Sequence, residues 1–192
     1  MHMSRQSYFV VLAVAVALAG CSKSATANGW PRYRDPHGNF SISYPPGWKI
    51  DAKHDYQALG RDKDIYGVAF TVAPERAAGT NLSDDSYLAI ETLPNAPRCV
   101  ASLFLDNAAG PEMPENGKTG IAWSVARGAD AGAGNFYDET VYAALGSKPC
   151  IAIRYFVHST NIGNYDPGTV KAFDEKALTA TFDEMRNSFR LH

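Results

Sequence analysis

Polar and aromatic residues between positions 158 and 168 could contact a ligand or a partner protein. This stretch contains His158, Asn161, Asn164 and Tyr165. Loops on a rigid scaffold often carry binding residues, and Asn and Tyr are adaptable hydrogen-bonding groups. The same stretch also contains Asp, Pro and Gly, which set backbone angles in turns. The sequence therefore predicts a candidate binding loop and leaves open a purely structural turn.

Arg154 is the candidate binding cation, and it precedes this loop in a run of alternating residues. If the segments 135–144 and 150–158 form a hairpin, Asp138 or Glu139 faces Arg154 across the two strands. A cross-strand ion pair is the simpler interpretation. A ligand-binding role would require an open cleft around the guanidinium.

No motif for catalysis or for a cofactor occurs in the sequence. The chain has no G-x-S-x-G motif of a hydrolase nucleophile and no G-x-G-x-x-G motif of a dinucleotide-binding loop. His37, His54 and His158 lie too far apart in sequence for a metal-binding motif. We therefore expect no enzyme activity, no bound metal and no cofactor.

Residues 1–20 have the composition of a secretory signal peptide. Arg5 precedes a nearly unbroken apolar stretch over 8–19, and Ala19 and Gly20 are the small residues before a cleavage site. The apolar stretch is too short to cross a hydrocarbon core of about 30 Å as a helix. We expect this peptide to be removed on export.

The run Leu18-Ala19-Gly20-Cys21 resembles the lipobox of bacterial lipoproteins. In that family the cysteine thiol receives a diacylglycerol, and two or three acyl chains hold a protein stably on a membrane. The resemblance implies lipidation of Cys21. Because Ser22 follows, rather than the aspartate that retains such proteins in the inner membrane, it implies an outer-membrane lipoprotein facing the periplasm, or else the cell exterior. A plain secretory signal with a chance cysteine is the alternative.

Two cysteines remain, Cys99 and Cys150. In the oxidising compartment of an exported protein, an even pair predicts a disulfide. Closing this loop would restrict the unfolded chain by about 4 kcal/mol in the entropy model. Two buried free thiols are the alternative.

The charge of the chain argues against nucleic acid as a partner. The formal net charge is −2, and 20% of the residues are charged. These charges form no basic block, which a phosphate-binding surface requires. Contact with a membrane would therefore come from the lipid anchor.

The polarity pattern predicts a tether over 21–38 and one domain over 39–192. Alternation of apolar and polar residues predicts strands, joined by segments rich in Gly and Pro. The expected strands cover 39–44, 48–52, 65–72, 87–93, 121–127, 135–144 and 150–158. For 87–93 a helix is also open, but Pro94 favours the strand. The last three strands have short joints and should form an antiparallel meander.

Two helices complete the expected fold. The segment 97–107 has proline near its start and predicts a short helix, whereas 108–120 predicts an exposed connection. Over 171–189, apolar residues at helical spacing form one stripe. The sequence therefore predicts an α+β fold, an antiparallel sheet with a C-terminal amphipathic helix packed on it.

Both ends of the domain resemble PsbP-like domains, which are α/β/α sandwiches found in many bacterial lipoproteins. At the front, the matching residues are Phe40-Ser-Ile-Ser-Tyr44, followed by Pro45 and Trp48, and at the back Ser188-Phe189. The resemblance implies the sandwich fold and no particular activity.

With an anchor, a disulfide and no catalytic motif, the sequence favours a non-enzymatic, lipid-anchored envelope protein that binds another periplasmic protein, for example as an inhibitor or immunity protein. A small-ligand carrier with a pocket between sheet and helix is the alternative, and a hydrolase ranks last. A pocket of several hundred Å³ lined by aromatic residues would favour the carrier.

Overall fold

Antiparallel strands make up most of the molecule. The structure, a computed structural model, describes residues 29–60 and 64–192. The strands in these ranges are β1 (Arg32–Arg34), β2 (Phe40–Ser43), β3 (Lys49–Asp55), β4 (Tyr66–Thr71), β5 (Tyr87–Leu93), β6 (Ala108–Asn116), β7 (Ala122–Gly132), β8 (Asn135–Ala144), β9 (Cys150–Thr160) and β10 (Arg190–Leu191). The helical segments there are α1 (Pro74–Ala77), α2 (Glu175–Ser188) and two short 3₁₀ turns, η1 (Ala101–Phe104) and η2 (Ile162–Asn164).

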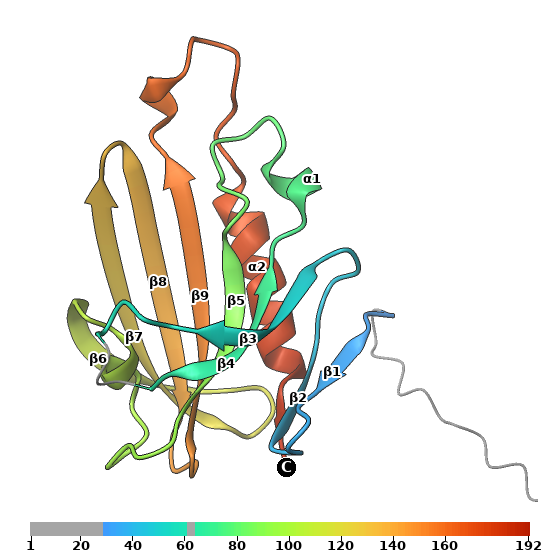
Figure 1. The fold of residues 1–192 in the computed structure, drawn as a ribbon, viewed down its shortest axis with the longest axis vertical. Coiled ribbons are helices and arrows are strands. Elements are labelled where there is room, and N and C mark those ends of the chain that lie inside the picture. The colour runs from blue at the N-terminus through green and yellow to red at the C-terminus, as the bar shows by residue number, and fades with distance from the viewer. Residues whose placement is uncertain (1–28, 61–63) are drawn as a thin grey trace, which may run out of the picture.

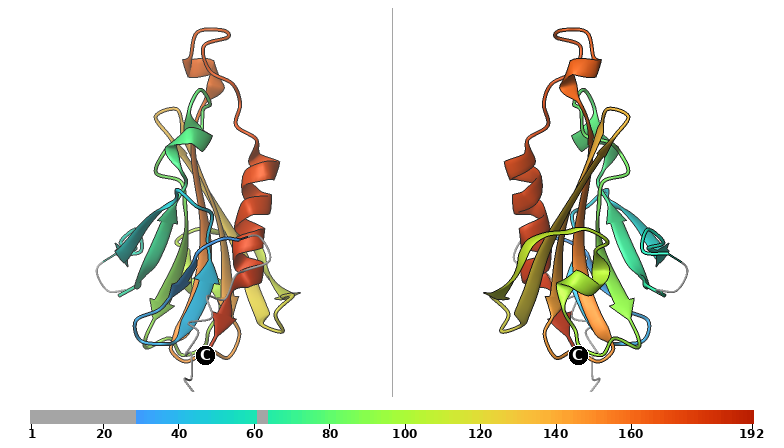
Figure 2. Two further views of the ribbon diagram at one scale, coloured as in Figure 1. Left: turned by 90° about the vertical axis from the view of Figure 1, so that its right-hand side faces the viewer. Right: turned by 90° about the vertical axis from the view of Figure 1, so that its left-hand side faces the viewer.

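The strands form two sheets (Figure 1). The larger has seven strands in the order β3-β4-β5-β9-β8-β7-β6, and the smaller has the order β1-β2-β10. Strands β7, β8 and β9 are neighbours in sequence and in space and form the predicted antiparallel meander, which β6 extends by one strand. Helix α2 lies along one face of the larger sheet, as the side views show (Figure 2), and also contacts β2.

The hairpin of β7 and β8 is longer than predicted. Strand β8 has its predicted bounds, but β7 continues beyond 121–127 to Gly132. Only Ala133 and Gly134 form the turn, with φ angles of 50° and 80°. Two successive residues with positive φ are typical of the tight turns that match strand twist. Most of the predicted glycine-rich joint is therefore strand.

Alternation along β9 produces two cores on opposite faces of the sheet. Ile151, Ile153 and Tyr155 belong to a cluster that includes the apolar residues of α2. Cys150 and Ala152 belong to a second cluster, which includes residues of η1. Successive side chains of a strand point to opposite faces, so the alternation along β9 places these residues in separate cores.

The predicted C-terminal helix is confirmed. Its apolar stripe buries Leu178, Phe182 and Met185. The side chain of Asp174 accepts a hydrogen bond from the backbone N–H of Ala177 at 2.9 Å, which caps the first turn. This cap defines the residue at which α2 begins.

The predicted α+β class is wrong, because the described chain is mostly β. Within the described ranges, α2 is the only helix longer than four residues. The segment 97–107 contains only the turn η1, where the backbone N–H of Ala101 donates to the side chains of Glu112 and Ser124. The α/β/α sandwich implied by the PsbP-like resemblance is therefore not the fold.

Two segments predicted to lack regular structure are strands. The expected connection 108–120 contains β6, an edge strand whose register with β7 is irregular between Ala109 and Met113. Proline is tolerated at such an edge because no ladder hydrogen bond is lost there. Within the expected tether 21–38, strand β1 pairs with β2. The folded domain therefore begins earlier than predicted.

The predicted signal peptide 1–20 and the predicted lipidation site Cys21 lie outside the described residues. In the part of the chain that is described, no helix is both long enough and apolar enough to cross a membrane.

Candidate functional site

A buried charge cluster lies on the sheet face opposite α2. Arg154 has no exposed surface, and its guanidinium donates to both carboxylate oxygens of Glu91, at 2.8 and 2.9 Å. It also donates to the carbonyl of Phe104 at 2.6 Å and to the carboxylate of Glu139. The guanidinium lies 3.6 Å from the ring centroid of Tyr56. The predicted cross-strand ion pair is confirmed for Glu139.

The electrostatics of this cluster favour its charged forms. Burial alone would raise the pKa of Glu91, but the Arg154 guanidinium and a hydrogen bond with His54 hold that pKa below its ordinary value. Burial raises the pKa of Tyr56, so its phenol stays protonated and donates to Glu139. Among the described residues, no buried side-chain nitrogen or oxygen lacks a partner. The cluster is a satisfied structural network, with no open cleft around the arginine.

Two of the predicted binding residues, Arg154 and His158, lie in β9, as the expected strand over 150–158 implies. His158 has Nδ1 2.8 Å from a carboxylate oxygen of Asp85 and Nε2 3.0 Å from the side-chain oxygen of Asn135. Its ring stacks on Tyr137 with 4.5 Å between centroids. Arg154 lies four residues earlier, inside the buried cluster. The structure therefore does not bring Arg154 to the loop.

The other three predicted residues hold the loop together. Asn161 accepts a hydrogen bond from a backbone N–H two residues later and caps η2. Asn164 donates to the carbonyl of Gly134 in the β7–β8 turn at 3.3 Å. The hydroxyl of Tyr165 lies 2.7 Å from that of Thr160. These contacts support the structural interpretation of the loop.

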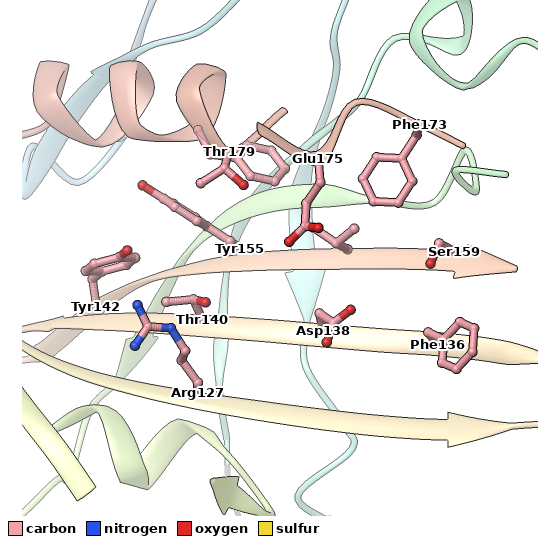
Figure 3. Close-up of a pocket in the computed structure, with 12 residues that line it drawn as sticks. Arg127, Phe136, Asp138, Thr140, Tyr142, Tyr155, Ser159, Phe173, Glu175 and Thr179 are labelled. Carbon is pink, nitrogen blue, oxygen red and sulfur yellow. The ribbon is translucent and has the colours of Figure 1, made fainter. Parts of the chain in front are cut away.

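A pocket of about 330 Å³ opens on the other face, between α2 and strands β7, β8 and β9 (Figure 3). The strands form its floor. The first turns of α2, together with Phe173, which lies two residues before the helix, form its roof. Its lining residues are Arg127, Phe136, Asp138, Thr140, Tyr142, Tyr155, Val157, Ser159, Phe173, Glu175, Thr179 and Phe182.

Strand pairing arranges the floor of the pocket in rows. Across β8 and β9 the paired residues are Thr140 with Tyr155, Asp138 with Val157, and Phe136 with Ser159. Arg127 of β7 pairs with Thr140 and extends the first row. Residues two apart in a strand share a face, so the register places these side chains together on the face that α2 covers.

Two hydroxyls in the wall of the pocket form no hydrogen bond with a described residue. Tyr142 and Ser159 are each only 6% exposed, and the side-chain hydroxyl of neither bonds to a described residue. By contrast, the hydroxyl of Tyr155 donates to Asp183 at 3.0 Å and accepts from Arg186 at 2.9 Å. Because no buried side-chain oxygen of the described residues lacks a partner, the hydroxyls of Tyr142 and Ser159 are the parts of these side chains that reach the open space of the pocket.

Three charged residues of the pocket are also unpaired. Arg127, Asp138 and Glu175 are exposed, and none forms an ion pair with another described residue. Asp138, which the sequence offered as a partner of Arg154, points to the pocket side of β8 instead. The pocket thus combines one free cation, two free carboxylates, hydroxyls and aromatic rings.

A second pocket, of about 290 Å³, lies between β1–β2 and β3–β4. Its buried lining residues, Phe40 and Val68, are apolar. The carboxylate of Asp35 there already accepts hydrogen bonds from the backbone and side chain of Asn39, at 3.0 and 2.8 Å. This second pocket therefore offers fewer free polar groups to a ligand.

Sequence reasoning missed most of the pocket. The alternation in 135–144 places Phe136, Asp138, Thr140 and Tyr142 on one face, and this mixture of aromatic and polar residues was the available signal. What the sequence did not provide was the register of that strand against β9 or the position of α2 above it.

The two cysteines predicted to be paired lie at disulfide distance. The sulfur atoms of Cys99 and Cys150 are 2.05 Å apart, and the Cα atoms 4.9 Å. The pair connects the segment before η1 to the start of β9, across 51 residues of sequence. It lies in the second core, on the sheet face opposite the pocket.

No protein-family model and no curated protein matches this sequence. The chain is similar to a protein from Bacteroides thetaiotaomicron VPI-5482 whose crystal structure was solved at 1.50 Å resolution. The similarity has a TM-score of 0.41 at 12% sequence identity and covers 84% of this chain and 48% of that one. The chain therefore spans about half of that protein, and a similarity this low carries no functional argument.

Proposed function

We propose that this protein is a non-enzymatic binding protein that carries a small polar ligand in the pocket between α2 and the larger sheet. The observation that carries this proposal is that the hydroxyls of Tyr142 and Ser159 bond to no described residue and are open to the pocket, although the two residues are otherwise buried. A ligand with polar groups could form hydrogen bonds with both hydroxyls, and its binding would also cover the exposed charges nearby.

The size and walls of the pocket support a small molecule. A volume of about 330 Å³ lies at the lower end of the range of about 300–1,000 Å³ that is usual for ligand pockets. Phe136, Phe173 and Phe182 supply apolar walls, and the polar residues supply orientation. This combination of aromatic walls and few polar groups is typical of ligand sites.

A protein partner, which the sequence favoured, now has less support. The candidate binding loop would have been its contact surface, but the side chains of Asn161, Asn164 and Tyr165 in this loop bond within the protein.

We further propose that the carrier is anchored in the cell envelope by lipid on Cys21. The run Leu18-Ala19-Gly20-Cys21 supports this proposal. The expected site is the periplasmic side of the outer membrane, with the cell exterior as the other option. The anchor would keep the ligand site close to a membrane surface.

The pocket can be tested with one hydroxyl removed at a time. The full chain in detergent is screened by thermal shift against neutral, cationic, anionic and zwitterionic small molecules, and binders are measured by calorimetry. Tyr142→Phe should weaken binding by about 1 kcal/mol, the usual net value of one hydrogen bond. Its thermal stability should stay unchanged, because the hydroxyl has no partner in the protein.

Tyr155→Phe is the matched control. It removes a hydroxyl that bonds to Asp183 and Arg186, so it should lower stability. If no compound class binds, or if binding is indifferent to Tyr142→Phe and Ser159→Ala, the pocket is not a ligand site. Turnover of a bound compound would contradict the non-enzymatic part of the proposal.

A further inference from the structure

The acidic and basic side chains of the pocket lie in different parts of it. In Figure 3, the carboxylate of Glu175 reaches from α2 toward the sheet, and Asp138 rises from β8 below it. Phe136 and Phe173 lie to one side of this pair, and Arg127 and its neighbours to the other. The pocket therefore has an acidic, aromatic part and a basic, hydroxyl-rich part.

The acidic part is suited to an ammonium group. Neither Asp138 nor Glu175 has a cationic partner among the described residues. A bound ammonium would donate to both carboxylates, and hydrogen bonds between charged groups are the strong ones. The rings of Phe136 and Phe173 add the negative faces that attract cations.

The basic part is suited to a carboxylate. Arg127 pairs across the strands with Thr140, and Tyr142 is two residues further along β8. A guanidinium forms paired hydrogen bonds with a carboxylate. Burial raises the pKa of Tyr142, so its hydroxyl stays protonated and can donate a further hydrogen bond.

On the basis of the function proposed above, we infer that the ligand is a small zwitterion of amino-acid size. Its ammonium group binds between Asp138 and Glu175, and its carboxylate binds Arg127 with the hydroxyls of Thr140 and Tyr142. Arg127 and Asp138 are diagonal neighbours on adjacent strands, which have Cα atoms about 7–8 Å apart. A short molecule can therefore reach both.

The test uses probes that differ in one charge. L-Leucine, L-phenylalanine and L-lysine are titrated into the full chain in detergent, each as the free amino acid, the methyl ester and the N-acetyl derivative. The free form should bind most tightly. Asp138→Asn with Glu175→Gln should weaken the free form and the ester by about tenfold or more. Arg127→Gln should weaken the free and N-acetyl forms and leave the ester unchanged.

Glu184→Gln is the matched control, because this residue is exposed on α2 and does not line the pocket. It should change none of these affinities. The inference is overturned if the N-acetyl form binds best or if the carboxylate variants bind the free form normally. It is also overturned if only uncharged compounds bind. In that case, weaker binding by the Tyr142→Phe variant would still support the proposed function. If no compound class binds, both fail.

Discussion

At the scale of single residues, the two faces of the larger sheet differ in whether their polar side chains are hydrogen-bonded within the protein. On one face, Arg154 donates to Glu91, Glu139 and a backbone carbonyl, so that its charge is fully compensated. On the other face, the hydroxyls of Tyr142 and Ser159 bond to no described residue and are open to the pocket. The bonded groups of the first face stabilise the fold, whereas the free hydroxyls of the second face are available to a ligand.

Arg154→Met tests the structural assignment. Removing the cation leaves Glu91 buried and uncompensated, which should lower the free energy of unfolding by about 3–5 kcal/mol. Urea unfolding measures the change. The double variant Arg154→Met with Glu91→Leu should recover part of the lost stability because it also removes the uncompensated carboxylate of Glu91. A single variant as stable as the wild type would show that the pair is not buried as described.

Glu91 should also make stability depend on pH. Its pKa is lowered in the folded state, chiefly because Arg154 outweighs the effect of burial. The unfolded chain therefore binds protons more readily, and the stabilisation is present above the ordinary pKa of 4.5 and lost as pH falls through the folded value. Urea unfolding below about pH 5 should show this decline. In Glu91→Gln the decline should be weaker, and an equal decline would assign it to other carboxylates.

At the scale of elements, the parts that follow from local patterns were predictable. The bounds of β8, the two faces of β9 and the apolar stripe of α2 depend on periodicity within one segment. Strand β6 was missed because it contains Gly110, Pro111 and Pro114, which signal loops. Strand β1 was missed because it is short and flanked by Pro31 and Pro36. Both strands pair with a neighbouring strand. The pocket depends on the register of three strands and the position of α2, none of which is local.

The Cys99–Cys150 link belongs to this scale because it joins two elements of the second core. The alternatives of a disulfide and two free thiols predict different responses to reductant. With the link formed, reduction or Cys99→Ala with Cys150→Ala should lower the free energy of unfolding by about 2–5 kcal/mol. Thermal unfolding with and without reductant measures this. An unchanged melting temperature together with two titratable thiols would favour the free-thiol alternative.

At the scale of the whole molecule, the proposed anchor and the folded domain are close in sequence. Cys21 is separated from β1, which begins at Arg32, by residues 22–31. Ten residues reach at most about 35 Å when fully extended. A lipid on Cys21 would thus hold the domain near the membrane surface, unlike the longer tether that the sequence suggested.

Cys21→Ala should release the protein from the membrane fraction. Acyl chains would supply the stable attachment, and the weakly acidic chain has no basic surface block to replace them. Fractionation with immunoblotting of wild type and variant measures the effect, and Ser22→Ala is the neighbouring control. A variant that stays in the membrane fraction would contradict lipid anchoring at this cysteine.

The most direct test of ligand carriage is to locate the ligand on the protein by NMR. Backbone amide shifts are followed while zwitterionic, charged and neutral small molecules are added to the isotope-labelled chain. A binder should shift the amides of Thr140, Ser159 and Thr179, which surround the pocket, and Tyr142→Phe should require a higher ligand concentration for the same shifts. Shifts that appear only around Asn161 and Tyr165, or no shifts with any compound class, would contradict a ligand site between α2 and the sheet.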